Sequence, residues 1–358
     1  QFGTRIMGGK DHASARYIFT MLNPMTRSIF RPEDDAILNY LDDDGYKIEP
    51  ETFFPVLPMV LVNGAQGIGT GYSTNIPSYN PKDIIKNIRN FIIGEPMVEM
   101  TPWFKGFKGE VTPKTEDNAF TTHGVYRILD KYHIEVSELP IGVWTQNYKE
   151  FLEGLVTGES KSKNKLNVID YENHSTEDNV RFIIKLGRKQ DIPVLVNEVQ
   201  EEIEVALKLT SSISLRNMHL FDSNNKIRKY ESPLEILKEF CNIKLAKTEE
   251  RRVHMIKQIT RQVTIEEQKV KFIEAIMNDT LVIFKKKKDE ITKELSSMGF
   301  IKVENSYNYL MDMKVHVFTD ERIQELKNSL ESKQKTKANI ESMDNKKMWA
   351  IDLRKVDI

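Results

Sequence analysis

The chain has 358 residues, of which 39% are hydrophobic and 29% charged, and its formal net charge is -1. This length is sufficient for two or three domains with hydrophobic cores, and the composition is typical of a globular protein with an extended, charged portion. No apolar run approaches the roughly 20 residues that span a bilayer, and no signal peptide opens the sequence, which argues against a membrane protein.

Residues 1–31 are locally basic in this nearly neutral chain. Asp11 is the one acid among them, and five Lys or Arg residues oppose it for a local charge of +4, namely Arg5, Lys10, Arg16, Arg27 and Arg31. We therefore expect an anion-binding surface to be confined to this segment.

The pair Arg16-Tyr17 is the first candidate for chemistry. A tyrosine hydroxyl has a pKa of about 10, so as a nucleophile it needs a nearby cation, base or metal. The guanidinium of Arg16 stays charged and its donors match phosphate oxygens. Attack on a phosphodiester would give a phosphotyrosyl bond close in energy to the bond broken, so the break would be reversible. The alternative is an ordinary Arg-Tyr pair with a half-buried ring.

An acidic segment follows, with eight carboxylates and one base, Lys47, between Pro32 and Glu51. We interpret DDAILNYLDDD as a solvated helix and turn rather than a metal site. In a DNA-binding protein, its charge would repel phosphate and restrict where the duplex can lie.

An apolar run at 57–62 leads into four glycines between residues 64 and 71. The P-loop lysine is missing and the spacing does not fit GxGxxG, so a nucleotide pocket is weakly indicated. Ile68, flanked by two glycines, is either a core residue under a turn or an apolar wedge that enters DNA from the minor groove.

Regular elements are predicted next. The spacing of Ile84, Ile85, Ile88 and Ile92 predicts a helix after Pro81. Residues 101–186 have the alternating pattern of β-strands, with a hairpin near Asp130, and helices are predicted at 144–155 and 191–209. The aromatic and basic residues at 103–108 fit a core or a nucleic-acid contact, and TGESKSKNK at 157–165 is typical of a mobile basic loop.

From Ser232 the sequence predicts a long helical arm. Ser232, Pro233 and Glu235 form a helix start signal, and the pattern continues to about Asn278. Its a/d seam contains Ile256, Ile259, Val263, Val270, Ile273 and Met277, broken by Glu266. A returning antiparallel helix is predicted after Thr319.

A small globular tip is predicted between these two helices, at residues 279–318. Its aromatic and apolar residues are Phe284, Phe300, Tyr307, Tyr309 and Leu310. The Lys285–Lys288 run is interpreted as a solvated surface.

The remaining residue types give negative indications. The single cysteine, Cys241, rules out an internal disulfide and is interpreted as a packed helix residue rather than a reactive thiol. The seven histidines show no zinc spacing, so no metal ligand is predicted in this chain. No Walker A sequence or DxD-like cluster is present.

Several motifs closely resemble the breakage-reunion region of eukaryotic-type (type IIA) DNA topoisomerase II. They are QFGTR, GGKD, SARYIFT, LPMVLVNGAQGIGTGYSTNIP, ISLRNM and YNYLMDM, and the resemblance runs essentially the whole chain. It implies that Tyr17 becomes joined to a DNA 5′ phosphate, that Arg16 stabilises the scissile phosphate and that Ile68 intercalates. Arg5, Lys10 and Ser14 are implied as further DNA contacts.

The resemblance also implies a mixed α and α/β multidomain fold. Residues 1–56 would be the end of a winged-helix domain with the catalytic tyrosine, 57–217 a tower domain, and 218–358 a coiled-coil arm with a helical tip that dimerises as the C-terminal gate. The implied function is ATP-dependent passage of one duplex through a double-strand break in another. Localisation in the nucleus is implied, or in a cytoplasmic replication factory for a large DNA virus.

The chain begins at Gln1 and is expected to be a piece of a longer enzyme. The resemblance implies that Mg2+ and ATP are bound by N-terminal segments absent from this chain, so the fragment alone is expected to be inactive. His12, Gln66 and Tyr72 depart from the family's usual Ala, Glu and Trp. His12 is also a weak candidate for the base that activates Tyr17, since the family takes its histidine from elsewhere.

Two alternatives to a topoisomerase remain. A noncatalytic coiled-coil scaffold associated with DNA would explain the arm but leave Arg16-Tyr17 and the glycine segment without a role. A nucleotide-dependent enzyme would use the loop at 63–71.

Overall fold

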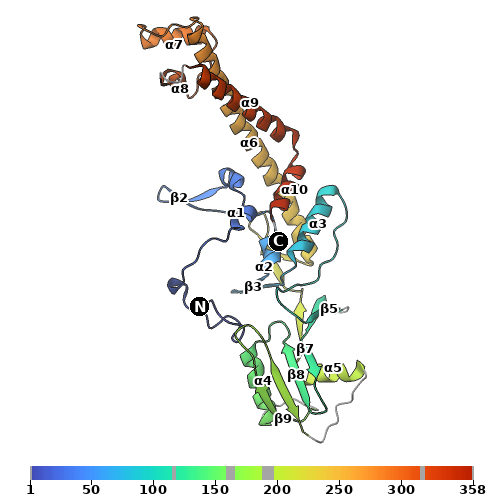
Figure 1. Cartoon of the computed structure of the whole chain (residues 1–358). Coiled ribbons are helices and arrows are strands. Elements are labelled where there is room, and N and C mark those ends of the chain that lie inside the picture. The colour runs from blue at the N-terminus through green and yellow to red at the C-terminus, as the bar shows by residue number, and fades with distance from the viewer. Residues whose placement is uncertain (1, 115–117, 159–165, 188–196, 315–318, 357–358) are drawn as a thin grey trace. The chain divides into compact units, whose positions relative to one another are not determined.

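The computed structural model describes residues 2–114, 118–158, 166–187, 197–314 and 319–356 (Figure 1). By their internal contacts the residues separate into two units. Unit 1 comprises residues 1–26, 57–241 and 358, and unit 2 comprises residues 27–56 and 242–357. Helices and strands are mixed in this chain, which confirms the predicted fold class.

A four-stranded antiparallel sheet, a helix at residues 145–156 and a helix at residues 197–206 form the main core of unit 1. Helix α4 (Thr145–Val156) buries Tyr148 and Leu152 in the same apolar cluster as Phe182 of the sheet. The strand order is β7-β8-β10-β9, formed by Val125–Ile128, His133–Glu138, Phe182–Leu186 and Val168–Asn173. The predicted hairpin near Asp130, between β7 and β8, and the predicted helix at 144–155 are therefore confirmed.

A second sheet of unit 1 has the order β11-β6-β5, formed by Thr210–Ser214, Ala119–His123 and Glu110–Lys114. The predicted strand character of residues 101–109 is wrong. Gly106 has a left-handed φ of 82° in a turn where the Phe107 N–H donates to the Phe104 carbonyl at 3.1 Å, so the strand starts only afterwards.

Helix α5 (Asn197–Ala206) falls inside the predicted helix at 191–209. The first residues of that prediction, and most of the predicted basic loop at 157–165, lie outside the described residues.

The apolar run and the glycines form a helix and a hairpin in unit 1. Helix α2 (Met59–Asn63) is followed by the antiparallel pair β3 (Ala65–Ile68) and β4 (Ser73–Ile76). Helix α3 (Pro81–Ile93) then buries the four predicted isoleucines, which confirms that prediction. A further hairpin consists of β12 (Met218–Phe221) and β13 (Ile227–Tyr230).

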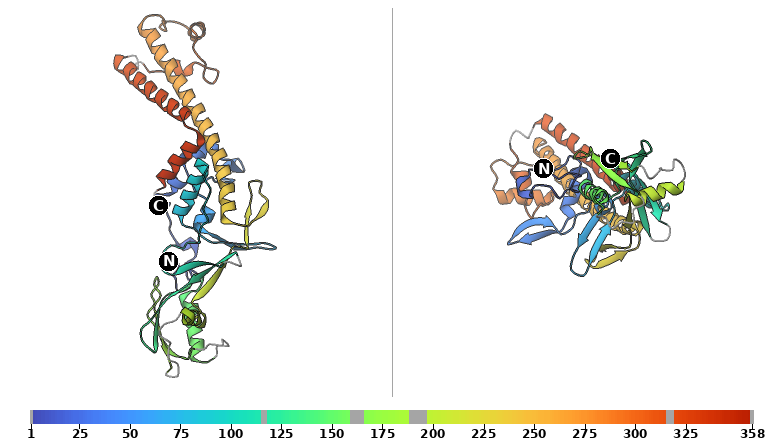
Figure 2. Two further views of the ribbon diagram at one scale, coloured as in Figure 1. Left: turned by 90° about the vertical axis from the view of Figure 1, so that its right-hand side faces the viewer. Right: turned by 90° about the horizontal axis from the view of Figure 1, so that it is seen from below.

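The predicted arm is present. Helix α6 (Pro233–Met277) has 45 residues, and the Ser232 hydroxyl accepts the Glu235 N–H at 3.2 Å, as the start signal predicts. Helix α9 (Asp320–Ser342) runs beside it in both views of the arm (Figures 1 and 2).

Contacts between the two arm helices confirm that they are antiparallel. Lys327 pairs with Glu274 at 2.7 Å, and six residues further along α9, Lys333 pairs with Glu266, which lies earlier on α6. Glu266, which interrupts the apolar seam, also accepts the Ser329 hydroxyl at 3.2 Å. The charge in the seam is therefore satisfied by the returning helix.

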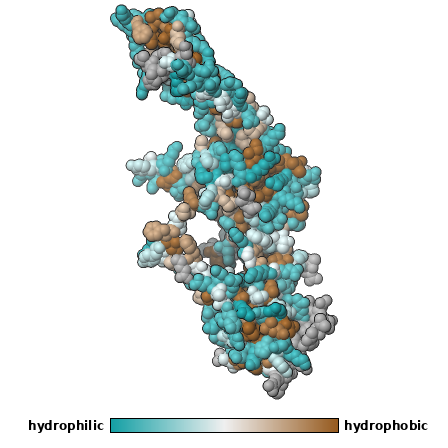
Figure 3. Space-filling model, viewed as in Figure 1, coloured by the Kyte–Doolittle hydropathy of each residue, from teal (hydrophilic) through white to brown (hydrophobic). Residues whose placement is uncertain are grey.

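The tip of the arm has its own core, as predicted. Helices α7 (Lys288–Ser297) and α8 (Asn308–Met311) enclose a cluster that includes Phe300, Tyr307 and Leu310. Phe284 differs from the expectation, since 73% of its surface is exposed. Brown, apolar atoms gather at this tip in Figure 3, whereas much of the arm's surface is hydrophilic.

The acidic segment of unit 2 is only partly as predicted. Helix α1 (Thr26–Ile29) and the 3-10 helix η2 (Pro32–Ile37) are followed by a hairpin of β1 (Tyr40–Asp43) and β2 (Tyr46–Pro50). The prediction of a helix over residues 40–43 is wrong because Asp44 and Gly45 have φ values of 50° and 86°, which suit a tight hairpin turn.

Asp34 also differs from the prediction for the acidic segment, because it is buried rather than solvated. Its carboxylate lies 3.0 Å from the Lys244 ammonium and 3.3 Å from a guanidinium nitrogen of Arg251. Arg251 also pairs at 2.5 Å with Asp352 on helix α10 (Asn345–Lys355). The side chains of Asp34, Lys244, Arg251 and Asp352 are each at most 7% exposed. We call these four residues the buried ion cluster.

Cys241 is fully buried in helix α6, which confirms its interpretation as a packed residue. Burial raises the pKa of its thiol to about 12. A thiol with this pKa is protonated at neutral pH and is a poor nucleophile.

Candidate functional site

Tyr17 ends the 3-10 helix η1 (Ala15–Tyr17) in unit 1, and 68% of the residue's surface is exposed. The Tyr17 N–H donates to the carbonyl of Ser14 at 2.9 Å, which closes the turn. The guanidinium carbon of Arg16 lies 4.8 Å from the centre of the Tyr17 ring. The structure therefore presents the phenol and the adjacent cation together at the surface rather than in a half-buried pair.

The other predicted contacts of the N-terminal segment differ in their surroundings. Lys10 and Ser14 are exposed, and no ion pair is found for Lys10 or Arg16 among the described residues. These two cations are thus available to an anionic ligand. Arg5, in contrast, forms an ion pair with Glu138, whose side chain is 1% exposed.

Residues 3–12 form a loop that is closed on itself. The Thr4 backbone N–H and hydroxyl donate to the two carboxylate oxygens of Asp11 at 2.9 and 2.6 Å, and the Gly9 N–H donates to the Thr4 carbonyl at 2.8 Å. The hydrogen bonds from Thr4 hold the pKa of the Asp11 carboxyl below its usual value. Asp11, the one acid of the segment, therefore has a local structural partner. We call residues 3–12 the N-terminal loop.

Glu138 is a residue of this region that sequence reasoning did not identify. It lies at the end of β8, fully buried, and accepts the N–H groups of Leu139 at 2.9 Å and Lys108 at 3.3 Å in addition to Arg5. Along this strand Glu138 alternates in phase with Ile134 and Val136, which is a sequence signal for its burial, but nothing in the sequence pairs it with Arg5.

The glycine segment presents Ile68 at the end of a hairpin. Ile68 is the last residue of β3, pairs with Ser73 and is 92% exposed. The Gly69 N–H donates to the Tyr72 carbonyl at 2.9 Å, and Gly71 has a φ of 87°. The alternative of a core isoleucine under the turn is therefore wrong.

The base of this hairpin is anchored elsewhere in unit 1. The Asn75 N–H donates to the Asn217 carbonyl at 2.7 Å, and the Asn217 side chain donates to the Ser73 hydroxyl at 2.8 Å. Tyr72 is one of the departures from the family pattern. Its ring packs edge-on against the ring of His219, with 5.9 Å between the ring centres. The hairpin that carries the exposed Ile68 is therefore held at its base by these contacts.

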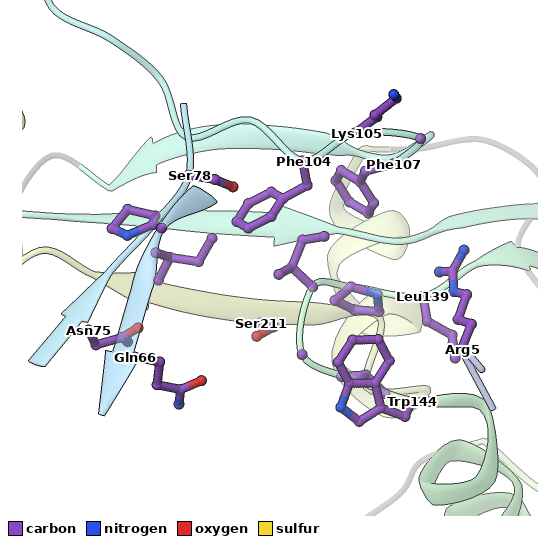
Figure 4. Close-up of a pocket in the computed structure, with 18 of the residues that line it drawn as sticks. Arg5, Gln66, Asn75, Ser78, Phe104, Lys105, Phe107, Leu139, Trp144 and Ser211 are labelled. Atoms are coloured by element: carbon purple, nitrogen blue, oxygen red, sulfur yellow. The ribbon is translucent and has the colours of Figure 1, made fainter. Parts of the chain in front are cut away.

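A cavity of about 840 Å³ lies within unit 1, between the N-terminal loop and the hairpin. Figure 4 shows Gln66 and Asn75 of the hairpin at one end of the view and Arg5, Leu139 and Trp144 at the other. Of the four glycines between residues 64 and 71, the described lining of this cavity includes Gly64 alone, so the glycine segment does not cradle a phosphate in it.

His12 contacts its own segment, and the described residues contain no metal centre. The Nδ1 atom of His12 lies 2.8 Å from the Ala13 carbonyl oxygen. Among the described residues, no group of three or more His, Cys, Asp or Glu side chains is placed to hold a metal ion. In the same part of the chain, no helix combines the length and apolar character needed to cross a membrane.

Comparisons with known proteins agree on one family. The family model of the DNA gyrase/topoisomerase IV A-subunit matches residues 1–354. DNA topoisomerase 2 of Plasmodium falciparum is 39% identical over all of this chain, and that of Pisum sativum is 40% identical over 84% of it. The chain spans 27% and 20% of the lengths of these two relatives.

A solved structure is also similar. It is the crystal structure of the Plasmodium falciparum topoisomerase II DNA-binding, cleavage and re-ligation domain, with 39% sequence identity and a TM-score of 0.84. The similarity covers 99% of this chain and 51% of that one.

Proposed function

Because this chain belongs to the DNA gyrase/topoisomerase IV A-subunit family, we propose that it is part of the DNA-cleaving core of a type II DNA topoisomerase. The observation that carries the proposal is the exposed Tyr17 phenol with the Arg16 guanidinium beside it. The Tyr17 hydroxyl gives up its proton to solvent as its oxygen attacks a DNA phosphorus and forms a phosphotyrosyl bond with the 5′ phosphate. The bond from phosphorus to the 3′ oxygen breaks, and this oxygen takes up a proton. Reversal of the same step reseals the strand.

Arg16 has a separate role in this proposal. Its guanidinium has no competing carboxylate among the described residues, and its planar donor fork matches phosphate oxygens. It therefore stabilises the additional negative charge that develops on the phosphate during attack. Lys10 and Ser14 contact the flanking backbone from the same segment.

Cofactors and partners belong to the complete enzyme. The described residues offer no cluster that fits a metal ion, so no step is assigned here to a metal held by them. We place the Mg2+ and ATP sites in other domains of the enzyme, and the contact with a second copy of the chain at the apolar tip of the arm, where Phe284 is exposed. The boundaries 1–56, 57–217 and 218–358 for the winged-helix part, tower and arm belong to this proposal, as does a nuclear location.

The direct test uses the complete enzyme with Mg2+, ATP and interlinked plasmid circles. We expect separation of the circles and, after denaturation during turnover, protein attached to the 5′ ends of a double-strand break. A coiled-coil scaffold would give neither result. A nucleotide-dependent enzyme of another kind would hydrolyse ATP without changing DNA topology.

A separate prediction concerns Ile68 as a wedge between base pairs. Ile68→Ala removes most of an apolar side chain whose burial between bases would stabilise the bent duplex by about 1.5–3 kcal/mol. We expect the equilibrium constant for bending a short duplex to fall about tenfold or more. Fluorescence energy transfer between the two ends of the duplex measures the bending. The matched control is Ile93→Ala, since Ile93 is also an exposed isoleucine of unit 1, at 71%. Normal bending by Ile68→Ala would contradict the wedge.

A further inference from the structure

The contacts that dock the N-terminal loop on the rest of unit 1 are not used by the proposed chemistry. We infer that the Arg5–Glu138 ion pair is a positioning device, which holds the segment of Tyr17 in the place from which the phenol reaches DNA. The inference rests on the proposed function and assigns Arg5 a different role from the DNA contact that the sequence predicts.

The carboxylate of Glu138 fixes Arg5 firmly. One oxygen accepts the Leu139 N–H at 2.9 Å and the other accepts the Lys108 N–H at 3.3 Å, while both face the guanidinium of Arg5. The Arg5 side chain is 26% exposed and the Glu138 side chain 1%. A buried carboxylate is costly without its cation, so the pair resists separation. A bound phosphate would have to compete with this carboxylate for the same nitrogens.

Two backbone hydrogen bonds reinforce the docking. The Arg5 N–H donates to the Glu177 carbonyl at 3.0 Å, and the Ile6 carbonyl accepts the Gln146 N–H at 3.0 Å. Gln146 is the second residue of α4, where backbone N–H groups have no partner within the helix. The loop therefore supplies the cap that the side chain of Trp144 does not.

Close packing makes the docking specific. A Cβ atom on Gly8 would lie 2.4 Å from the ring of Trp144, so only glycine fits against this indole. Figure 4 shows Arg5 and Trp144 near each other at one end of the cavity. The ion pair and the glycine contact thus hold the loop at two points.

The docked loop is the anchor nearest to Tyr17. Asp11, which closes the loop through Thr4, precedes Tyr17 by six residues. Among the described contacts, no hydrogen bond joins residues 13–26 to residues 57–241. A shift of the loop is therefore carried to the phenol, and a misplacement of about 1 Å can cost about 100-fold in rate.

The test replaces Glu138 with glutamine in the complete enzyme. Because both carboxylate oxygens accept hydrogen bonds, either orientation of the amide places an N–H2 donor against a donor of Arg5 and a backbone N–H. We expect the single-turnover rate of adduct formation to fall about 10–100-fold. The affinity for DNA, and the slope of its logarithm against that of salt concentration, should stay as in the wild type.

The variants Arg5→Ala and Gly8→Ala should give the same pattern, and Arg5→Lys should recover part of the rate. Combining Arg5→Ala with Glu138→Gln should add little to either change alone, because both break one interaction. The matched control is Glu177→Gln, which makes the same change at an exposed acid that contacts Arg5 through its backbone carbonyl only.

Two results would overturn the inference. One is a wild-type rate for Glu138→Gln. The other is a salt slope lowered by about one for Arg5→Ala alone, as expected if Arg5 binds a phosphate directly. Each variant is compared with wild-type enzyme that forms the adduct. If the proposed function is wrong, the wild type itself forms no adduct, so the two failures can be told apart.

Discussion

Replacing Tyr17 with phenylalanine in the complete enzyme is expected to leave duplex binding unchanged and to reduce the covalent protein–DNA adduct by at least about 10⁴-fold. The change removes one oxygen atom from a side chain that is 68% exposed, so no packing is lost. The ring that Arg16 contacts is retained. Adduct formation and DNA affinity, measured on the same duplex, separate the loss of a nucleophile from the loss of binding.

Tyr46→Phe is the matched control for this experiment. Tyr46 lies on β2 of unit 2, is 76% exposed and undergoes the same loss of a hydroxyl. It should form the adduct at the wild-type rate. Substantial adduct from Tyr17→Phe would assign the nucleophile to another residue.

The second large effect is expected from Asp34→Ala in the buried ion cluster. The substitution leaves the cations of Lys244 and Arg251 without a shared carboxylate at sites where their side chains are 1% and 2% exposed. Breaking a buried pair by removing one partner typically costs about 3–5 kcal/mol of unfolding free energy. Unit 2 should therefore unfold at clearly lower denaturant concentration.

The neighbouring residue provides the control. Asp35 pairs with Arg27 at the surface, where the two side chains are 49% and 48% exposed, so Asp35→Ala should cost less than about 1 kcal/mol. Unfolding of unit 2 is followed through Trp349, which is fully buried and donates to the Val56 carbonyl at 3.1 Å. Replacing Trp103 and Trp144 with phenylalanine in every variant removes the emission of unit 1. Equal destabilisation by the two substitutions would contradict the assigned role of the cluster.

Local sequence patterns predicted the elements that local interactions determine. Helix α3 follows from four isoleucines at helical spacing, and the start of α6 follows from a serine cap and a proline in the first turn. The hairpin of β1 and β2 also has a local signal, the Asp44-Gly45 pair, which favours a tight turn. The prediction of a helix there rests on the charge pattern alone and does not use this pair.

Contacts between distant residues could not be predicted in this way. Asp34 looked like one carboxylate among eight, and only the fold brings it to Lys244, 210 residues away. Arg5 likewise looked like one cation of a basic segment until its contact with Glu138 became visible. The exposure of Tyr17 and Ile68 also depends on the fold, while their proposed roles came from the resemblance.

The most direct measurement identifies the amino acid that carries the DNA. The adduct formed by the complete enzyme is trapped, its DNA is digested to a short remnant, and the protein is cleaved with trypsin for mass spectrometry. We expect the nucleotide on the peptide of residues 11–27 or 17–27, in which Tyr17 is the one tyrosine, with fragment ions that place it on that side chain. A nucleotide attached to any other residue would contradict the assignment of Tyr17 as the nucleophile.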